Sequence, residues 1–299
     1  MPLVLDTDIG SDVDDALALA FALRHPDIDL VAVTTVADDV RLRAHIAHKL
    51  LQIAGRSDVE VAPGVGWKRS PSERRSAWGH EGRGLLDSDE TRPRFARDGV
   101  TLLVDETKHK ALEVATIGMQ SNIAAALDRD DDLARRVAHL HVMGGVFAPI
   151  RAHGRERPPS SDHNLVVDPT ASVRALNAGI PTTYVPLDVT VHAPLPRALL
   201  EELRGGDDLC RALARLVDVW IEVSRPPDDV AAIMHDPLTV ACTVDRRCVT
   251  VERLPVTVAI HDGVVRTFID PVEGAEAEVV TSVDGASFAN FWLETVLAS

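Results

Sequence analysis

The sequence has few cysteines and lacks the segments that would mark a membrane or exported protein. Cys210, Cys242 and Cys248 are an odd number without paired metal-ligand spacing, so neither a disulfide framework nor a zinc ribbon is expected. No apolar stretch reaches the length of a membrane span, and no basic segment followed by an apolar one opens the chain. We therefore predict a cytoplasmic protein with no membrane partner.

Basic residues are scarce relative to acidic ones. The chain has 31 Lys and Arg against 46 Asp and Glu, a formal net charge of -15. Such a charge repels nucleic acids and disfavours polyanionic substrates, so the expected ligand is a neutral or cationic small molecule. Because no internal repeat or low-complexity tract divides the chain, we predict one domain spanning residues 1–299.

Short apolar segments alternate with amphipathic ones along most of the chain. The apolar segments have the length of buried strands, and the others have the 3.6-residue period of helices. This alternation predicts the α/β class, as an open, mostly parallel doubly wound sheet. The expected strands are residues 3–5, 30–36, 59–62, 114–117, 140–143 and 182–186, and the expected helices are 14–24, 40–54, 100–108, 122–128, 170–178 and 287–297.

Loop and hairpin insertions interrupt this pattern. Residues 63–99 and 149–161 are rich in Gly, Pro and Arg, which predicts two long loops. Residues 197–224 predict a further helical region. Segments 249–260 and 264–269 flank His261-Asp262-Gly263 and predict a β-hairpin.

Five carboxylates follow the first expected strand within ten residues: Asp6, Asp8, Asp12, Asp14 and Asp15. Two such charges about 4 Å apart repel by roughly 4 kcal/mol at an effective dielectric of about 20, so the folded loop must bind metal, bind protons or open into water. Acids are common in the first turn of a helix, but that explains two of them better than five. The position at the carboxyl end of a parallel strand favours a metal, and all-oxygen ligands indicate calcium or magnesium.

Polar clusters also follow the later strands. They are Thr34-Thr35-Val36-Ala37-Asp38-Asp39, Gly118-Met119-Gln120-Ser121-Asn122, Met143-Gly144-Gly145, Asp162-His163-Asn164 and His235-Asp236-Pro237. Any one of them alone is explained by turn chemistry or helix capping. Because the carboxyl ends of parallel strands share one edge of a sheet, we expect all of them around one crevice.

In this order, these motifs resemble the inosine-uridine nucleoside hydrolase family over most of the chain. The resemblance implies hydrolysis of the N-glycosidic bond of ribonucleosides, which gives ribose and free nucleobase through an oxocarbenium-like transition state. It also implies a homodimer or homotetramer. Asp8, Asp15, Asp236 and the Ser121 carbonyl would hold calcium (Ca2+), and Asp14 would be the general base.

The same resemblance implies the residues that contact the substrate. Asp162, Asn164 and Asp39 would bind the sugar hydroxyls, and Met143 would pack under the ribose. His235 would face the nucleobase and orient or protonate it. Apart from the resemblance, aromatic faces favour planar rings, so Trp67, Trp78 and His80 of the first loop are candidates to stack on the base when the loop closes; packing within the loop explains them equally well.

Three departures from the family pattern affect these expectations. The acid loop is longer than the short Asp-x-Asp-Pro-Gly-x-Asp-Asp form, so Asp12 competes with Asp14 for the role of general base. For Asp6, a purely structural role is the alternative to a role in the site. Asp162 stands where Glu is usual and is one methylene shorter. Asp38-Asp39 replaces the familiar Gly-Asn and exchanges an amide for a carboxylate, which only accepts hydrogen bonds.

Two other functions stay open from the sequence. A strand ending in Asp6-Thr7-Asp8 is also typical of haloacid-dehalogenase-like, magnesium-dependent phosphohydrolases, although Gly10 and the net charge argue against that class. A non-catalytic calcium- and riboside-binding protein is the second alternative. The presence of a candidate base, a ligand set and His235 together favours an enzyme over a mere binder.

Overall fold

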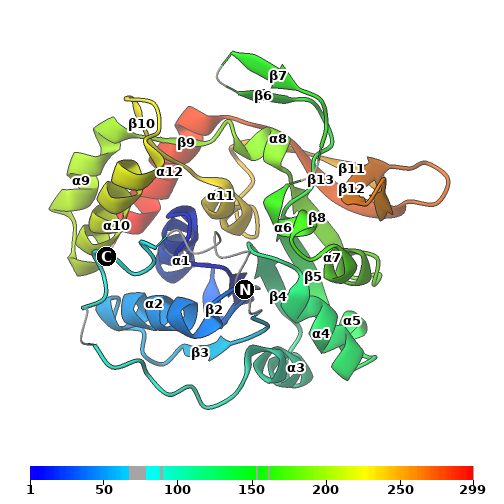
Figure 1. Cartoon of the computed structure of the whole chain (residues 1–299), viewed down its shortest axis with the longest axis horizontal. Coiled ribbons are helices and arrows are strands. Elements are labelled where there is room, and N and C mark those ends of the chain that lie inside the picture. The colour runs from blue at the N-terminus through cyan, green and yellow to red at the C-terminus, as the bar shows by residue number, and fades with distance from the viewer. Residues whose placement is uncertain (67–78, 88–89, 153, 161, 299) are drawn as a thin grey trace.

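A nine-stranded sheet forms the centre of the molecule (Figure 1). The computed structural model describes residues 1–66, 79–87, 90–152, 154–160 and 162–298; Trp67 and Trp78 lie outside these ranges. The strand order is β12-β11-β13-β8-β5-β4-β1-β2-β3. The strands are β1 (Pro2–Thr7), β2 (Asp29–Thr35), β3 (Glu60–Pro63), β4 (Leu112–Thr116), β5 (Val137–Met143), β8 (Thr182–Val185), β11 (Val249–His261), β12 (Val264–Ile269) and β13 (Ala275–Val283).

The strands of the sheet are mostly parallel. All neighbouring pairs from β13 to β3 run parallel, and only the pairs that β11 makes with β12 and β13 are antiparallel. The chain moves from β1 outward through β2 and β3 on one side and through β4, β5 and β8 on the other. The strand order therefore reverses between β1 and β4, where open α/β sheets form their ligand crevice. The expected doubly wound fold is confirmed.

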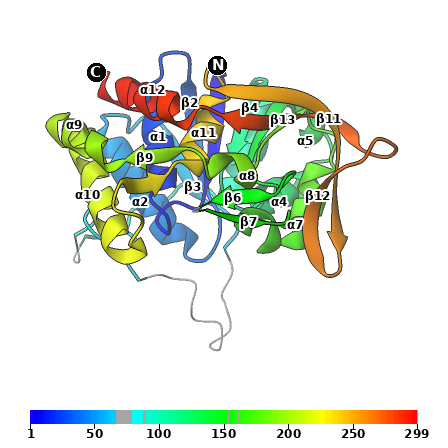
Figure 2. The same cartoon turned by 90° about the horizontal axis from the view of Figure 1, so that it is seen from above.

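Helices cover both faces of the sheet (Figures 1 and 2). The main helices are α1 (Asp14–Arg24), α2 (Val40–Ile53), α3 (Gly99–His109), α4 (Ser121–Arg129), α7 (Pro169–Leu176), α9 (Leu200–Gly205), α10 (Asp208–Ser224), α11 (His235–Ala241) and α12 (Gly285–Leu297). Short helices are α5 (Leu133–Arg136), α6 (His163–Val166), α8 (Leu187–Thr190) and the 3-10 turn η1 (Arg197–Leu199).

Alternating side chains of β1 divide the hydrophobic core into two layers. Leu3 and Leu5 pack with α1, α2, α10, α11 and α12, whereas Val4 packs with α3, α4 and α7 on the opposite face. This is the two-residue period of a strand that is covered on both sides. The indole of Trp292 in α12 donates a hydrogen bond to the carbonyl of Leu17 in α1, which ties the end of the chain to the helix that carries the acids.

Several strands of the structure do not follow from the patterns of the sequence. β13 was not expected, yet it joins the hairpin strand β11 to the parallel sheet. The second insertion is not entirely loop, because β6 (Ile150–Ala152) and β7 (Arg155–Arg157) form a small hairpin. β9 (Pro194–Pro196) and β10 (Val230–Ile233) form another pair. Each of these strands is short or gains its partner from a distant segment, so local periodicity does not reveal it. Among the described residues, no helix is long and apolar enough to span a membrane.

Candidate active site

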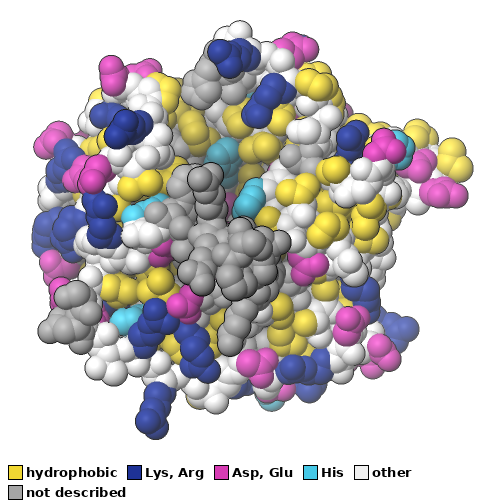
Figure 3. Space-filling view, viewed as in Figure 1, with side chains coloured by type: hydrophobic (Ala, Val, Ile, Leu, Met, Phe, Trp, Pro, Cys, Tyr) yellow, Lys and Arg dark blue, Asp and Glu magenta, His cyan; other side chains and the backbone are white. Residues whose placement is uncertain are grey.

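The acid loop between β1 and α1 opens into a cavity of about 400 Å³. Asp8, Asp12, Asp14 and Asp15 line it. Figure 3 shows the face of Figure 1 as a space-filling view, with histidine side chains near its middle. Gly10 lets the loop bend at a φ of 118°, where a side chain would also meet Ile46 of α2 at 2.8 Å.

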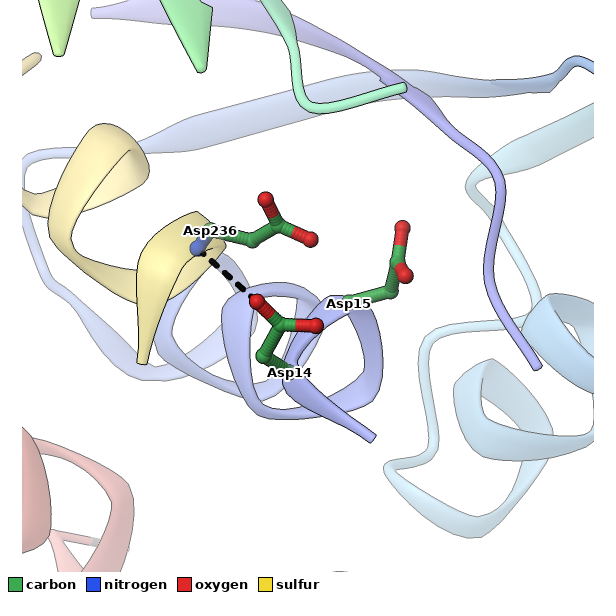
Figure 4. Close-up of side chains that lie close together, drawn as sticks. All are labelled: Asp14, Asp15 and Asp236. Atoms are coloured by element: carbon green, nitrogen blue, oxygen red, sulfur yellow. Dashed lines mark hydrogen bonds between the residues drawn. The ribbon is translucent and has the colours of Figure 1, made fainter. Parts of the chain in front are cut away.

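Three carboxylates converge at the base of this cavity (Figure 4). Asp14 and Asp15 occupy the first turn of α1, and Asp236 occupies the first turn of α11. One oxygen from each lies within 4.8 Å of the others, and all three side chains are buried. The backbone N–H of Asp236 donates to Oδ2 of Asp14 at 3.3 Å, and the Thr7 hydroxyl donates to Asp15. Packing of α11 on α1 therefore unites acids that are 222 residues apart in the sequence.

Like charges at this site disfavour ionisation of the acids. Burial, followed by neighbouring acids, raises the pKa of Asp14 and Asp236 well above the usual range. Burial raises the pKa of Asp12 to about 7. Burial also raises the pKa values of Asp8 and Asp15, which the positive charge of Arg43 opposes.

This donor set fits a hard divalent cation, which would supply the missing positive charge and accept carboxylate oxygens as ligands. The residues grouped most closely are Asp14, Asp15 and Asp236. Asp8 lines the same cavity but does not belong to that group. The fifth acid has a different environment: Asp6 is fully buried beneath the loop, and its carboxylate accepts hydrogen bonds from Thr34 and Asn122. Its contacts are those of a structural residue.

His235 also lines the cavity, at the first position of α11. Its Nδ1 shares a hydrogen bond of 2.6 Å with the Thr190 hydroxyl, which orients the ring. Burial lowers the pKa of His235 to about 4. The ring is therefore neutral near pH 7 and suited to hydrogen bonding with a ligand.

The loop after β5 and the start of α6 supply the opposite wall. Met143, Asp162 and Asn164 all line the cavity. The Asp162 carboxylate accepts hydrogen bonds from the backbone N–H groups of Gly145 and Leu165, so the shorter side chain caps α6. The Asn164 amide donates to the carbonyls of Ile117 and Met143. Its hydrogen bonds join the strand ends of β4 and β5.

Three of the expected site residues lie outside the cavity lining, although all three are in described segments. Ser121 opens α4, and its hydroxyl donates to Asp168; Met119, two residues earlier, faces the cavity instead. His80 packs behind the acid loop, where its Nε2 lies 2.9 Å from the Ser11 carbonyl.

Asp39 is the third. It caps α2 through the N–H of Leu42 and pairs with Arg92 at 2.9 Å, and its side chain is 53% exposed. Asp38 takes the place in the cavity wall and is only 20% exposed. The Asp39 carboxylate is held outside the cavity because it accepts the N–H of Leu42 and pairs with Arg92.

Several lining residues were not expected from the sequence. Arg43 of α2 and Trp220 of α10 are the largest of them. Arg43 falls four residues after Asp39, on the buried side of an amphipathic helix. The helical period of the sequence could therefore have predicted that Arg43 is buried. Trp220 lies within α10 and not in a segment that directly follows a strand of the central sheet, so no local pattern indicates its role. The others are Ser11, Ile117 and Leu187; Asp38, Met119 and His163 also line the cavity, and they belong to clusters expected at the crevice but had no role assigned.

Comparison with known proteins shows a family and related folds. Residues 3–290 match the family model of the inosine-uridine preferring nucleoside hydrolases. The chain is 30% identical over 254 residues to a pyrimidine-specific ribonucleoside hydrolase, RihA, of Salmonella arizonae, covering 81% of this chain and 78% of that protein.

Two solved structures have the same fold over nearly their whole length. One is the plant nucleoside hydrolase PpNRh1, with a TM-score of 0.81 and 24% identity over 100% of this chain and 99% of that one. The other is a purine-preferring ribonucleoside hydrolase from Gardnerella vaginalis, with a TM-score of 0.80 and 25% identity over 99% and 98%. The chain belongs to the inosine-uridine preferring nucleoside hydrolase family and is an N-glycosyl hydrolase of ribonucleosides.

Proposed function

We propose that this nucleoside hydrolase is calcium-dependent and cleaves the N-glycosidic bond through an oxocarbenium-like transition state. The observation that carries the proposal is the convergence of Asp14, Asp15 and Asp236 on a cavity of about 400 Å³, a volume that suits a small molecule. The family match argues against the alternative that the chain is a haloacid-dehalogenase-like phosphohydrolase. A silent riboside-binding protein would not need a buried carboxylate beside the ligand set.

The proposed cation ligands are Asp8, Asp15 and Asp236. The Ser121 carbonyl stays the fourth proposed protein ligand, and the carbonyl of Met119, a residue that lines the cavity, is the alternative. When bound, calcium would lower the pKa of a water and anchor the hydroxyls of the sugar. Asp14 and Asp12 stay available for proton transfer on the same side of the cavity.

Asp14 is the proposed general base. Its Oδ2 is held by the backbone N–H of Asp236, which orients the carboxylate within the cluster. Asp14 would accept the proton of the water that attacks the anomeric carbon of the ribosyl group. The surrounding carboxylates stabilise the positive charge that the sugar ring gains in the transition state more than they stabilise the neutral nucleoside.

The remaining lining residues divide between sugar and base. Asn164, Asp162 and Asp38 are the proposed contacts of the sugar hydroxyls, with Met143 beneath the ring. The Asp162 carboxylate also caps α6. Any hydrogen bond from the sugar to Asp162 would therefore go to an oxygen that already accepts a backbone hydrogen bond. His235 is proposed to orient the departing nucleobase as a neutral hydrogen-bonding group.

The proposed partner is a single small nucleoside. The related proteins include a pyrimidine-specific and a purine-preferring hydrolase, so the nucleobase preference of this chain is left to the substrate screen described below. A single domain, a homodimer or homotetramer and a cytoplasmic location stay predictions from the sequence and its resemblance.

The test is a screen for ribose release from purine and pyrimidine nucleosides, with a generic phosphate ester as the comparison. Each reaction is run after chelation and again after addition of calcium or magnesium chloride. We expect ribose release that chelation abolishes and calcium restores. Ribose release that persists at full rate in excess chelator would contradict the calcium proposal, and phosphate release without ribose would contradict the proposed reaction.

A further inference from the structure

Arg43 joins two loops of the cavity wall. Its Nη1 donates to the Ile9 carbonyl at 3.0 Å and its Nη2 to the Ser11 hydroxyl at 2.9 Å, both in the acid loop after β1. Its Nε donates to the Ala37 carbonyl at 3.0 Å, in the turn after β2. Arg43 itself is 4% exposed, so these contacts are made away from water.

The turn after β2 has an unfavourable backbone conformation. Ala37 and Asp38 have φ values of 71° and 48°, in the left-handed region that residues other than glycine rarely adopt. Such a conformation persists only where the surrounding contacts determine it, and it is enriched at functional sites. Here Arg43 binds the Ala37 carbonyl, and its Nη2 lies 3.7 Å from the Asp38 carboxylate. These contacts accompany the orientation that places Asp38, and not Asp39, in the cavity wall.

We propose that Arg43 is a positioning residue, whose guanidinium holds the acid loop and the Ala37–Asp38 turn against each other so that Asp8 and Asp38 face the cavity together. The proposal deepens the proposed function and rests on it in one respect, the binding of a cation at this cavity. It assigns Arg43 no contact with the reacting atoms.

The chemistry of the side chain explains why arginine is required. Three different nitrogens donate to three acceptors that belong to two loops, and a planar guanidinium presents its donors in a fixed fork. The ammonium of lysine keeps the charge but is a compact group that cannot reproduce this spread. Since the guanidinium is already engaged, Arg43 acts on the loops and is not a binding site for an anionic substrate.

The experiment measures calcium binding by the full chain with Arg43→Lys and Arg43→Met substitutions. Chelator-treated protein is titrated with calcium chloride alone in a calorimeter, so the readout does not depend on activity. Residues that orient metal ligands typically change metal affinity by about 10- to 100-fold when replaced. We therefore expect both variants to bind calcium at least about tenfold more weakly than the wild type.

Arg41→Met is the matched control, because Arg41 lies on the same helix but is exposed. We expect this variant to keep calcium affinity within about twofold of the wild type, since it removes no contact to either loop. Wild-type affinity in Arg43→Lys would overturn the proposal, because the lysine lacks the fork. A variant of Arg43 that loses only thermal stability, with unchanged calcium affinity, would also overturn it. Arg43→Lys decides the question if Arg43→Met does not fold.

A second readout separates positioning from general stability. With saturating calcium and uridine or inosine as substrate, Arg43→Lys and Asp38→Asn should each raise KM, and the double variant should raise it by less than the product of the two changes. Independent, multiplicative effects would overturn the link between Arg43 and Asp38. If the wild type binds calcium but releases no ribose, the proposed function fails while the effect of Arg43 on calcium affinity still stands. A wild type that binds no calcium overturns the inference itself.

Discussion

Two polar clusters lie at opposite ends of the central strands and differ in how their charges are balanced. The acid cluster, at the carboxyl ends, consists of Asp8, Asp12, Asp14, Asp15 and Asp236. The paired row, nearer the amino ends, consists of Glu113, His139, His141, Thr183 and Glu278 on β4, β5, β8 and β13, with Arg246 from the segment between α11 and β11. The first gathers charges of one sign around a cavity, whereas the second alternates acids with bases and hydroxyls.

The pKa values of the two clusters move in opposite directions. Burial raises the pKa values of the acid cluster. In the paired row the hydrogen bond from Arg246 lowers the pKa of Glu278 to about 2. Burial opposes ionisation of Glu113, but His141 outweighs it and holds the pKa of Glu113 below its usual range. The row therefore keeps its acids ionised by means of its own residues, and the acid cluster does not.

This difference in pKa values favours the acid cluster as the functional one. A protein that needs only stability places opposite charges together, as the paired row does. Like charges that are buried beside a cavity lower stability unless a ligand compensates them, and such perturbed groups are typical of catalytic sites. Removing one acid from each cluster tests this difference.

The largest effect is expected from Asp14→Asn. Loss of a general base typically costs about 10²- to 10⁴-fold in rate, so we expect turnover to fall by about 10³-fold. Asp14 is not among the proposed calcium ligands, so calcium binding measured by calorimetry should be retained. The calcium-free variant should also resist urea better than the wild type, because one of several like charges is gone. Full ribose release by this variant would refute the role of Asp14, and transfer of the loss to Asp12→Asn would identify Asp12 as the base.

A smaller, pH-dependent effect is expected from Asp12→Asn. The pKa of Asp12 is about 7 in the folded chain and has a reference value of 3.8. Between these values the folded state keeps a proton that the unfolded state releases, so Asp12 lowers the free energy of unfolding increasingly as pH rises from about 4 to about 7. The stability gained by Asp12→Asn should therefore grow over that range and level off above it. Urea unfolding in chelator at several pH values measures the gain, and a gain independent of pH would argue against this interpretation.

The smallest effect is expected in the paired row. Glu113→Gln keeps the shape of the side chain but removes the charge that faces His141. We expect the free energy of unfolding to fall by about 1 kcal/mol, because Glu113 is partly exposed and its pair is partly screened. Ribose release should stay within about twofold of the wild type. Glu252→Gln, at an exposed position of β11, is the control. A large loss of turnover in Glu113→Gln would mean that the row is not merely structural.

Local patterns predicted the features that neighbouring residues determine. The strand before the acids, the helix that begins at Asp14 and the order of motifs at the strand ends all follow from apolar periodicity and from turn chemistry. The roles of Asp38 and Asp39 could not be separated in this way. Their orientations depend on Arg43 and Arg92, which reach the turn from α2 and from a segment about fifty residues later.

The α/β class, the family motifs and the excess of acids after the first strand are all encoded in the spacing of nearby residues. Which acids lie together depends on long-range packing, since Asp236 reaches Asp14 and Asp15 where α11 packs on α1. Such packing likewise placed Arg43 and Trp220 in the cavity wall and left Ser121, Asp39 and His80 outside it. Distances between segments far apart in the chain are set by how helices and strands pack, and no local pattern encodes them.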